Sequence, residues 1–164
     1  MCDRCGSGAG AHDIALTERP AHRLVGYFWE GTFAQAREGA VQPVLLKARA
    51  LSDSVSGLWR SPIVGLSWND RPDGFRYFAG IVGEDAPEGG GAIDLPEMTF
   101  ASSWHGADDG EVVQHYMRMI EWMGDESLSR DTERFAQREE YPNDYDPAAP
   151  LSLRLLLPIK PTAS

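Results

Sequence analysis

The order of hydrophobic and polar positions in the first half of the chain predicts a strand followed by a helix. Residues 21–28 are rich in the β-branched and aromatic residues that favour strands. Thr32 lies three residues before Gln35, which is the capping-box spacing that begins a helix, and we expect that helix over residues 33–51. Pro43 lies inside this range and has no backbone donor, so the helix should kink or divide into two.

A hairpin and a loop are predicted to follow this helix. Residues 63–68 and 75–82 are apolar enough to form two strands, and the intervening residues 69–74 have the Asn, Asp, Pro and Gly of a turn. Residues 84–94 contain three consecutive glycines and a proline, which indicates a loop. This loop is the best candidate for a junction between two halves.

The second half of the chain predicts the same order of elements. Residues 97–104 form a strand pattern, and Asp108 and Glu111 have the spacing of a helix N-terminus. Apolar residues then recur at helical spacing over residues 112–123, and Gly124 suits the position that ends a helix. Two further strands are expected at residues 135–141 and 151–159.

This repetition predicts an α+β fold of two duplicated, pseudo-symmetric βαββ units. An offset of 75 residues carries Trp29 onto Trp104 and makes Val64 the counterpart of Glu139. Two such units pair about a pseudo-twofold axis, form an antiparallel sheet and leave a ligand groove between the halves. The halves are expected at about residues 20–84 and 95–160, with the charge of the groove in the second half.

Composition and charge restrict the class of protein. The 164 residues suffice for one domain with a hydrophobic core. No apolar run approaches the roughly 20 residues of a membrane span, and the N-terminus has no apolar segment of a signal peptide, so we expect a cytoplasmic protein without membrane contact. The formal net charge of -10 repels phosphates and argues against direct binding of nucleic acid.

The two cysteines form a single C-x-x-C motif at the N-terminus. Cys2 and Cys5 supply only half of a tetrahedral zinc site, which His12 and His22 could complete. The Gly, Ser and Ala residues that follow Cys5 instead favour a flexible tail over residues 1–17 with two reduced thiols. We therefore expect no metal and no cofactor.

Several short motifs, in their order, resemble the GyrI-like small-molecule-binding domain, also called the effector-binding domain of AraC-type and MerR-type activators. The resemblance covers about residues 18–161, nearly the whole chain. The motifs are Phe75-Arg76-Tyr77-Phe78-Ala79-Gly80, Trp104-His105-Gly106 before an acidic helix, Ile120-Glu121-Trp122-Met123, Glu139-Glu140-Tyr141, Asp146-Pro147, and Leu155-Leu156-Leu157-Pro158-Ile159-Lys160.

The resemblance implies a binding protein for small molecules, acting as a stand-alone member of the family. Family members bind hydrophobic, often cationic, polyaromatic compounds in an aromatic groove, and the glutamate of an E-x-Y strand motif commonly lies in that groove. Glu139 and Tyr141 match this motif. Other stand-alone members resemble hydrolases of cyclopropane-bearing genotoxins, and others bind DNA gyrase. A protein partner, either gyrase or a regulator, is therefore a third alternative. The first 20 residues are too few for a DNA-binding helix-turn-helix.

The candidate binding residues are one carboxylate and a set of polar-edged aromatic side chains. The set is Glu139, Tyr141, Trp29, Trp68, Tyr77, Trp104, Tyr116 and Trp122. Glu139 and Glu140 are adjacent on a predicted strand and should point to opposite faces, with Glu139 on the face of Tyr141. A carboxylate among aromatic rings should have a raised pKa, because burial disfavours its charge. Such a group can balance a ligand cation or act as general base, so Glu139 is also the candidate catalytic residue.

Other catalytic patterns have little support in the sequence. His105 follows Trp104 and precedes a predicted helix, where it could donate a proton or hydrogen-bond the following turn. The chain has no G-x-S-x-G motif, and its three consecutive glycines lack the lysine and helix of a phosphate-binding loop. If the protein is an enzyme, a small-molecule hydrolase is the expected class.

Overall fold

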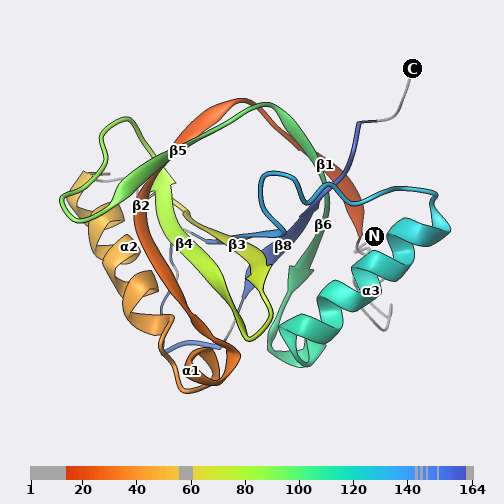
Figure 1. Ribbon diagram of the computed structural model, residues 1–164, viewed down its shortest axis with the longest axis horizontal. Coiled ribbons are helices and arrows are strands. Elements are labelled where there is room, and N and C mark those ends of the chain that lie inside the picture. The colour runs from red at the N-terminus through yellow and green to blue at the C-terminus, as the bar shows by residue number, and fades with distance from the viewer. Residues whose placement is uncertain are drawn as a thin grey trace.

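The computed structural model describes residues 14–55, 61–142, 144, 146, 148–150 and 152–161, and these form a mixed α and β fold (Figure 1). The strands are β1 (Ala15–Arg19), β2 (His22–Thr32), β3 (Ile63–Arg71), β4 (Gly74–Val82), β5 (Gly91–Leu95), β6 (Met98–His105), β7 (Gln137–Tyr141) and β8 (Leu153–Pro158). The helices are α1 (Phe33–Arg37), α2 (Gln42–Val55), the short 3-10 helix η2 (Ala107–Asp109) and α3 (Val112–Asp125).

The strands form one antiparallel sheet whose order reveals the duplication. The order is β1-β6-β8-β7-β3-β4-β2-β5, so β3 and β7 meet at the centre and each half contributes the three strands on its side. At the two edges the halves exchange strands. The first strand of the chain, β1, pairs with β6 of the second half, and β5, which opens the second half, pairs with β2 of the first.

The sheet is curled (Figure 1). Its two faces bury separate clusters of side chains. On one face α2 and α3 cover the cluster that we call the helix-side core, which includes Leu45, Ala48, Met119, Met123 and Leu155. The other, inner face holds the inner core, which consists of Leu24, Val64, Leu66, Phe78, Leu95, Phe100, Phe135 and Leu156. Alternate residues of each strand therefore serve different cores.

An ion-pair cluster on the inner face shows how far the sheet curls. Arg19 of β1 donates two hydrogen bonds to the carboxylate of Glu140 on β7, at 3.0 and 2.7 Å, although β6 and β8 lie between these strands in the sheet. Arg138 donates to the same carboxylate at 2.8 Å and to His22 at 3.0 Å. Its side chain is 3% exposed, so this cation depends on its buried partners.

The N-terminal signal of the first helix is confirmed. Gln35 N–H donates to Thr32 Oγ1 and the Thr32 N–H donates to Gln35 Oε1, which is the capping box. The expected division into two helices also occurs. Gly39, at φ 92°, follows the end of α1 in the left-handed conformation that glycine adopts readily. Pro43 then lies in the first turn of α2, where a missing donor costs little.

The predicted ends of the second-half helix are wrong. η2 occupies residues 107–109 and Gly110 has φ 77°, so Asp108 and Glu111 do not share one helical turn and Glu111 makes no side-chain cap. At the other end the helix continues through Gly124. Ser127 takes the left-handed conformation instead, with Leu128 N–H bonded to Met123 O at 2.8 Å and Ser127 N–H to Gly124 O at 3.1 Å. This is a Schellman motif one turn later than predicted.

Two strands were not predicted, and one of them changes the expected tail. β5 lies in the region expected to be a loop, and β1 begins at Ala15, within the range assigned to a flexible tail. β1 has no buried residue, and β5 has only two apolar positions on one face, Ile93 and Leu95, shortly after three glycines, so neither pattern was long enough to identify a strand. Cys2, Cys5 and His12 lie outside the described residues, while His22 is bonded to Arg138.

The offset of 75 residues does not relate equivalent positions of the two halves. It carries strand residues of one face onto positions that lie on the other face of the sheet. Trp29 packs against the helix-side core, whereas Ser103 and His105 face α3 and Trp104 between them therefore points to the inner face. Val64 likewise belongs to the inner core.

Among the described residues, no helix combines the length and the apolar character that a membrane crossing requires.

The inner-face ion pairs generate the first prediction. We expect Glu140→Ala to lower the free energy of unfolding at pH 7 by about 3–5 kcal/mol, because it leaves Arg138 buried beside Arg19 without a carboxylate. The measurement is urea unfolding. Glu30→Ala, in an exposed pair with Arg71, is the matched control and should cost less than about 1 kcal/mol. Equal losses in the two variants would contradict a dominant role of the buried pair.

The same ion pairs set a pH dependence. Burial alone would raise the pKa of Glu140, but its bonds to Arg19 and the charge of Arg138 outweigh burial and lower it. A depressed carboxyl pKa stabilises the fold above the unfolded value of about 4.3. We therefore expect the difference between wild type and Glu140→Ala to shrink as the pH falls below that value.

Candidate functional site

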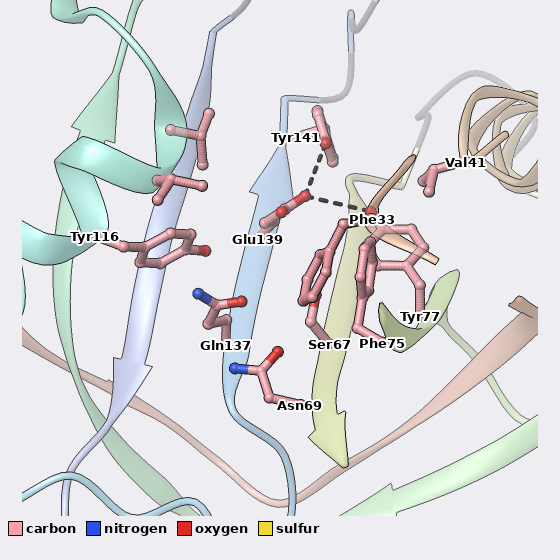
Figure 2. Close-up of a pocket in the computed structure, with 12 residues that line it drawn as sticks. Phe33, Val41, Ser67, Asn69, Phe75, Tyr77, Tyr116, Gln137, Glu139 and Tyr141 are labelled. Carbon is pink, nitrogen blue, oxygen red and sulfur yellow. Dashed lines mark hydrogen bonds between the residues drawn. The ribbon is translucent and has the colours of Figure 1, made fainter. Parts of the chain in front are cut away.

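A cavity of about 410 Å³ lies on the helix side of the sheet, over the junction of β3 and β7 (Figure 2). Its floor comes from the central strands, and its walls come from the α1 region and from the first turns of α3. The lining residues are Phe33, Val41, Ser67, Asn69, Phe75, Tyr77, Val112, Val113, Tyr116, Gln137, Glu139 and Tyr141. The cavity therefore lies between the two halves, where the duplication predicted a groove.

Strand alternation and one glycine position the polar floor. Glu139 of β7 pairs with Gly65 of β3 across the centre of the sheet, and Gln137 pairs with Ser67. Gly65 therefore lies opposite the carboxylate in the sheet. A Cβ at Gly65 would lie 2.4 Å from the Tyr77 hydroxyl. The glycine thus leaves the space through which Tyr77 reaches Glu139.

Two tyrosines hold the carboxylate of Glu139. Tyr141 Oη donates to Glu139 Oε2 at 2.8 Å, and Tyr77 Oη donates to the same oxygen at 3.2 Å (Figure 2). Among the described residues, no arginine or lysine is paired with this carboxylate. Burial raises the pKa of Glu139, and the two hydroxyl donors offset only part of that rise. The side chain remains half-buried because it opens onto the cavity.

The hydroxyls of Tyr77 and Tyr116 are neutral donors at physiological pH. Burial raises the pKa of both Tyr77 and Tyr116 well above the ordinary value, and the nearby charge of Glu139 raises them further. The Tyr116 hydroxyl donates a hydrogen bond to the backbone oxygen of Arg138, at 3.1 Å. Tyr77 and Tyr141 therefore donate hydrogen bonds to the Glu139 carboxylate, whereas Tyr116 contributes its ring to the wall of the cavity.

Aromatic rings in contact form one wall of the cavity. The ring centroids of Phe33 and Phe75 are 5.8 Å apart, and Phe75 also contacts Tyr77 edge-on at 6.5 Å. Trp29 packs behind Phe75 at 5.2 Å and forms a second layer. The facing wall, at the start of α3, is aliphatic and includes Val113, which is 66% exposed. The cavity thus offers ring faces on one side and an open edge on the other.

Glu139 and Glu140 point to opposite faces, as strand alternation predicted. Glu140 is held by two arginines on the inner face and its pKa is lowered, whereas Glu139 faces the cavity with hydroxyl partners and its pKa is raised. Of the residues that line the cavity, Glu139 is the one with a charge. A carboxylate in this setting can balance a bound cation or accept a proton from water.

The structure brings together half of the residues proposed from the sequence. Glu139, Tyr141, Tyr77 and Tyr116 line the cavity. Trp29 packs behind Phe75 of the aromatic wall and does not itself line the cavity.

The other three tryptophans proposed from the sequence lie elsewhere. Trp68 and Trp104 face the inner side of the sheet, where Arg76 and Arg154 stack on them at 4.9 Å from each ring centroid. Trp68 Nε1–H also donates to Arg134 O at 2.6 Å. Trp122 is at the far end of α3 from the cavity and packs on the helix-side core.

Sequence reasoning missed most of the other lining residues, although a signal for some was present. Period-two alternation from Tyr77 leads to Phe75, and alternation from the Glu139 partner position leads to Ser67 and Asn69. Phe33 and Val41 carry no such signal, since their approach depends on how α1 folds back beside β4. A separate group of possible metal ligands, His105, Asp109 and His115, lies outside the cavity.

Glu139→Gln is expected to raise the Tm of the unliganded protein at pH 7. Because burial raises the pKa of Glu139 on folding, its ionised form is less stable in the folded than in the unfolded chain. Glutamine removes the charge and still accepts hydrogen bonds from the tyrosines. As the pH falls through the raised pKa of Glu139, the carboxylate takes up a proton and the wild type gains stability. The difference in Tm between Glu139→Gln and the wild type should therefore narrow.

Thermal unfolding followed by circular dichroism at several pH values tests this. Glu140→Gln is the control of opposite sign, since it removes the negative charge between two arginines and should lower the Tm at pH 7. A lower Tm for Glu139→Gln at pH 7 would contradict the assignment of a destabilising charge.

Comparisons with solved structures show that the fold is shared with other proteins. The C-terminal domain of EcmrR matches with a TM-score of 0.63 at 12% identity, over 91% of this chain and 98% of that one. SAV2435, in a structure bound to tetraphenylphosphonium, matches with a TM-score of 0.62 at 15% identity, over 90% and 93%. A protein of Listeria innocua described as a hydrolase matches with a TM-score of 0.55 at 16% identity, over 90% and 92%.

Sequence comparison identifies the family. None of the curated proteins matches the chain. The family model of the GyrI-like small molecule binding domain matches residues 12–160, which is nearly the whole chain and includes every residue that lines the cavity. The chain therefore belongs to the GyrI-like small-molecule-binding family.

Proposed function

We propose that this protein binds hydrophobic cations with several aromatic rings, in the cavity above Glu139, as a means of sensing or sequestering a drug or toxin. One observation carries the proposal. The single charged side chain of an aromatic-walled cavity is a carboxylate that has hydroxyl partners and no cationic partner among the described residues. A ligand cation supplies the opposite charge that the protein itself does not place there.

The energetics favour a cation over a neutral ligand. Ring faces of the kind formed by Phe75 and Tyr77 attract a cation by about 0.5–2 kcal/mol per contact. A hydrogen bond from a ligand donor to a charged carboxylate contributes about 1.5–3 kcal/mol, and a cation without a donor is still attracted by its charge. The half-buried Glu139 is already partly desolvated, so a ligand cation gains attraction without the full cost of removing water from the carboxylate.

The size and openness of the cavity suit a drug-sized ligand. Its volume of about 410 Å³ falls within the range of about 300–1,000 Å³ typical of small-molecule sites. The fold is shared with SAV2435, whose ligand in the matched structure, tetraphenylphosphonium, is a cation carrying aromatic rings. This likeness supports the ligand class.

A hydrolase is the second candidate function, and the state of Glu139 is the observation that favours it. A carboxylate with a raised pKa, fixed by two tyrosine donors, can accept a proton from a water molecule in the cavity. The Listeria innocua protein that shares the fold is described as a hydrolase. For this candidate the substrate class implied by the family is a cyclopropane-bearing genotoxin. No described residue favours the gyrase alternative, which supercoiling assays with the purified protein would test.

Binding of tetraphenylphosphonium, compared with neutral triphenylphosphine oxide, tests the first proposal. By calorimetry we expect Glu139→Gln to weaken binding of the cation about 10-fold or more and to change binding of the neutral compound by less than about 3-fold, because the coulombic attraction between the ligand cation and the carboxylate is lost. Glu30→Gln removes an equal charge outside the cavity and is the control. Equal weakening of both compounds by Glu139→Gln would reject the counter-charge role.

Turnover separates the two candidates. Incubation of the protein with a cyclopropane-bearing alkylating compound, followed by mass spectrometry, should show stoichiometric binding and unchanged compound if the protein only binds. Product formation that Glu139→Gln abolishes would establish the hydrolase instead. Product formation unaffected by Glu139→Gln would reject Glu139 as the base.

A further inference from the structure

A second polar cluster lies where β6 ends against α3, apart from the cavity. His105 comes from the end of β6, Asp109 from η2 and His115 from the first turns of α3. One ligand atom from each of the three lies within 4.8 Å of the others. The two histidines are 2% and 0% exposed. Three elements that are separate in the sheet and helix layers therefore converge on one buried point.

The hydrogen bonds fix the direction of both imidazole rings. His105 Nδ1 and His115 Nδ1 face each other at 2.9 Å, so one of these nitrogens carries a proton and the other presents a lone pair. His115 Nε2 lies 2.8 Å from Ser103 Oγ, which anchors the far side of its ring. Asp109 Oδ2 accepts the N–H of Gly106 at 2.7 Å, which holds that carboxylate over the same turn.

We propose that His105 Nδ1, His115 Nδ1 and a carboxylate oxygen of Asp109 form a binding site for a divalent transition metal of the zinc class. Two nitrogen ligands on a tetrahedral zinc, each at about 2.0–2.1 Å, lie about 3.3 Å apart. The observed 2.9 Å is a few tenths of an ångström shorter, so small ring movements convert the hydrogen-bonded pair into a ligand pair.

The proton balance of this change is simple. In the hydrogen-bonded pair one ring is protonated at Nδ1 and the other at Nε2. In the metal-bound state both Nδ1 atoms hold lone pairs for the metal and both rings carry their proton on Nε2, so neither imidazole gains or loses a net proton. His115 Nε2–H then donates to Ser103 Oγ, which is the kind of outer partner that orients a metal-bound histidine.

The donor set selects the class of metal. Two imidazoles and one carboxylate suit zinc, cobalt, nickel or ferrous iron, whereas calcium and magnesium prefer sets made of oxygen. Three protein ligands leave a fourth position for water. Since the half-buried Asp109 forms the outer side of the cluster, that position lies toward the surface.

The histidine cluster lies beside the first turns of α3, which form one wall of the cavity. His115 is adjacent to Tyr116, and Val112 and Val113 precede it in the same two turns that form one wall of the cavity. A metal held between β6, η2 and α3 would fix the start of α3 to the sheet. The site is therefore expected to raise stability when loaded.

Cobalt titration of the full chain tests the proposal. The protein is used as Cys2→Ser/Cys5→Ser, so that the N-terminal thiols cannot bind the metal. We expect one cobalt ion per chain, ligand-field absorption in the visible without a thiolate charge-transfer band, displacement by zinc, and a Tm that rises with metal concentration. Failure to bind one cobalt ion would overturn the site.

Variants assign the ligands. Asp109→Asn keeps an oxygen that accepts the Gly106 N–H, so the fold should be retained, and His105→Asn removes one imidazole. Each is expected to weaken cobalt binding by at least about 10-fold, because losing even an outer partner costs about 10–100-fold. His22→Asn is the control, since His22 lies on β2 outside the cluster and should leave cobalt binding unchanged. Undiminished binding in folded Asp109→Asn and His105→Asn would overturn the proposal.

Discussion

The placement of one carboxylate at the centre of the sheet is the constraint on which the site depends. Glu139 lies where the two halves meet, on the floor of the cavity, and among the described residues it has tyrosine hydroxyls instead of a cation as partners. Neutral donors satisfy one oxygen of the carboxylate, Oε2, without cancelling the charge. Gly65 makes this possible because its missing side chain is the space that Tyr77 fills. The protein therefore keeps an uncompensated negative charge in an aromatic cavity.

The neighbouring residue, Glu140, has the same carboxylate group as Glu139 but the opposite surroundings. Glu140 is one position along the strand, faces the inner side, and is held between Arg19 and Arg138. Its charge is compensated and ties β1 to β7. The two adjacent glutamates thus differ in their surroundings: Glu140 pairs with arginines and stabilises the curled sheet, whereas Glu139 faces the cavity with tyrosine partners. The face of the strand, and not the residue type, decides which role each has.

Local signals made much of the fold and part of the site predictable. The Thr32–Gln35 capping box and the alternation that joins Glu139 to Tyr141 need only neighbouring residues, and both are present in the structure. Which face of the sheet the helices cover is a long-range property, so alternation alone did not exclude Trp68 or Trp104 from the cavity. β1 and β5 form through pairing with the other half, and their own sequences barely indicate a strand. The approach of His105 to His115 also depends on how α3 packs on β6.

The exchange of edge strands makes the two halves topologically interdependent. β1 completes the sheet of the second half and β5 completes that of the first, so a fragment cut between the halves would leave one edge strand of each sheet unpaired. An unpaired edge recruits a matching strand from another chain. Separately produced halves are therefore poor candidates for independent folding and good candidates for reassembly with each other. The duplicated unit, although repeated in the chain, is complete only as a pair.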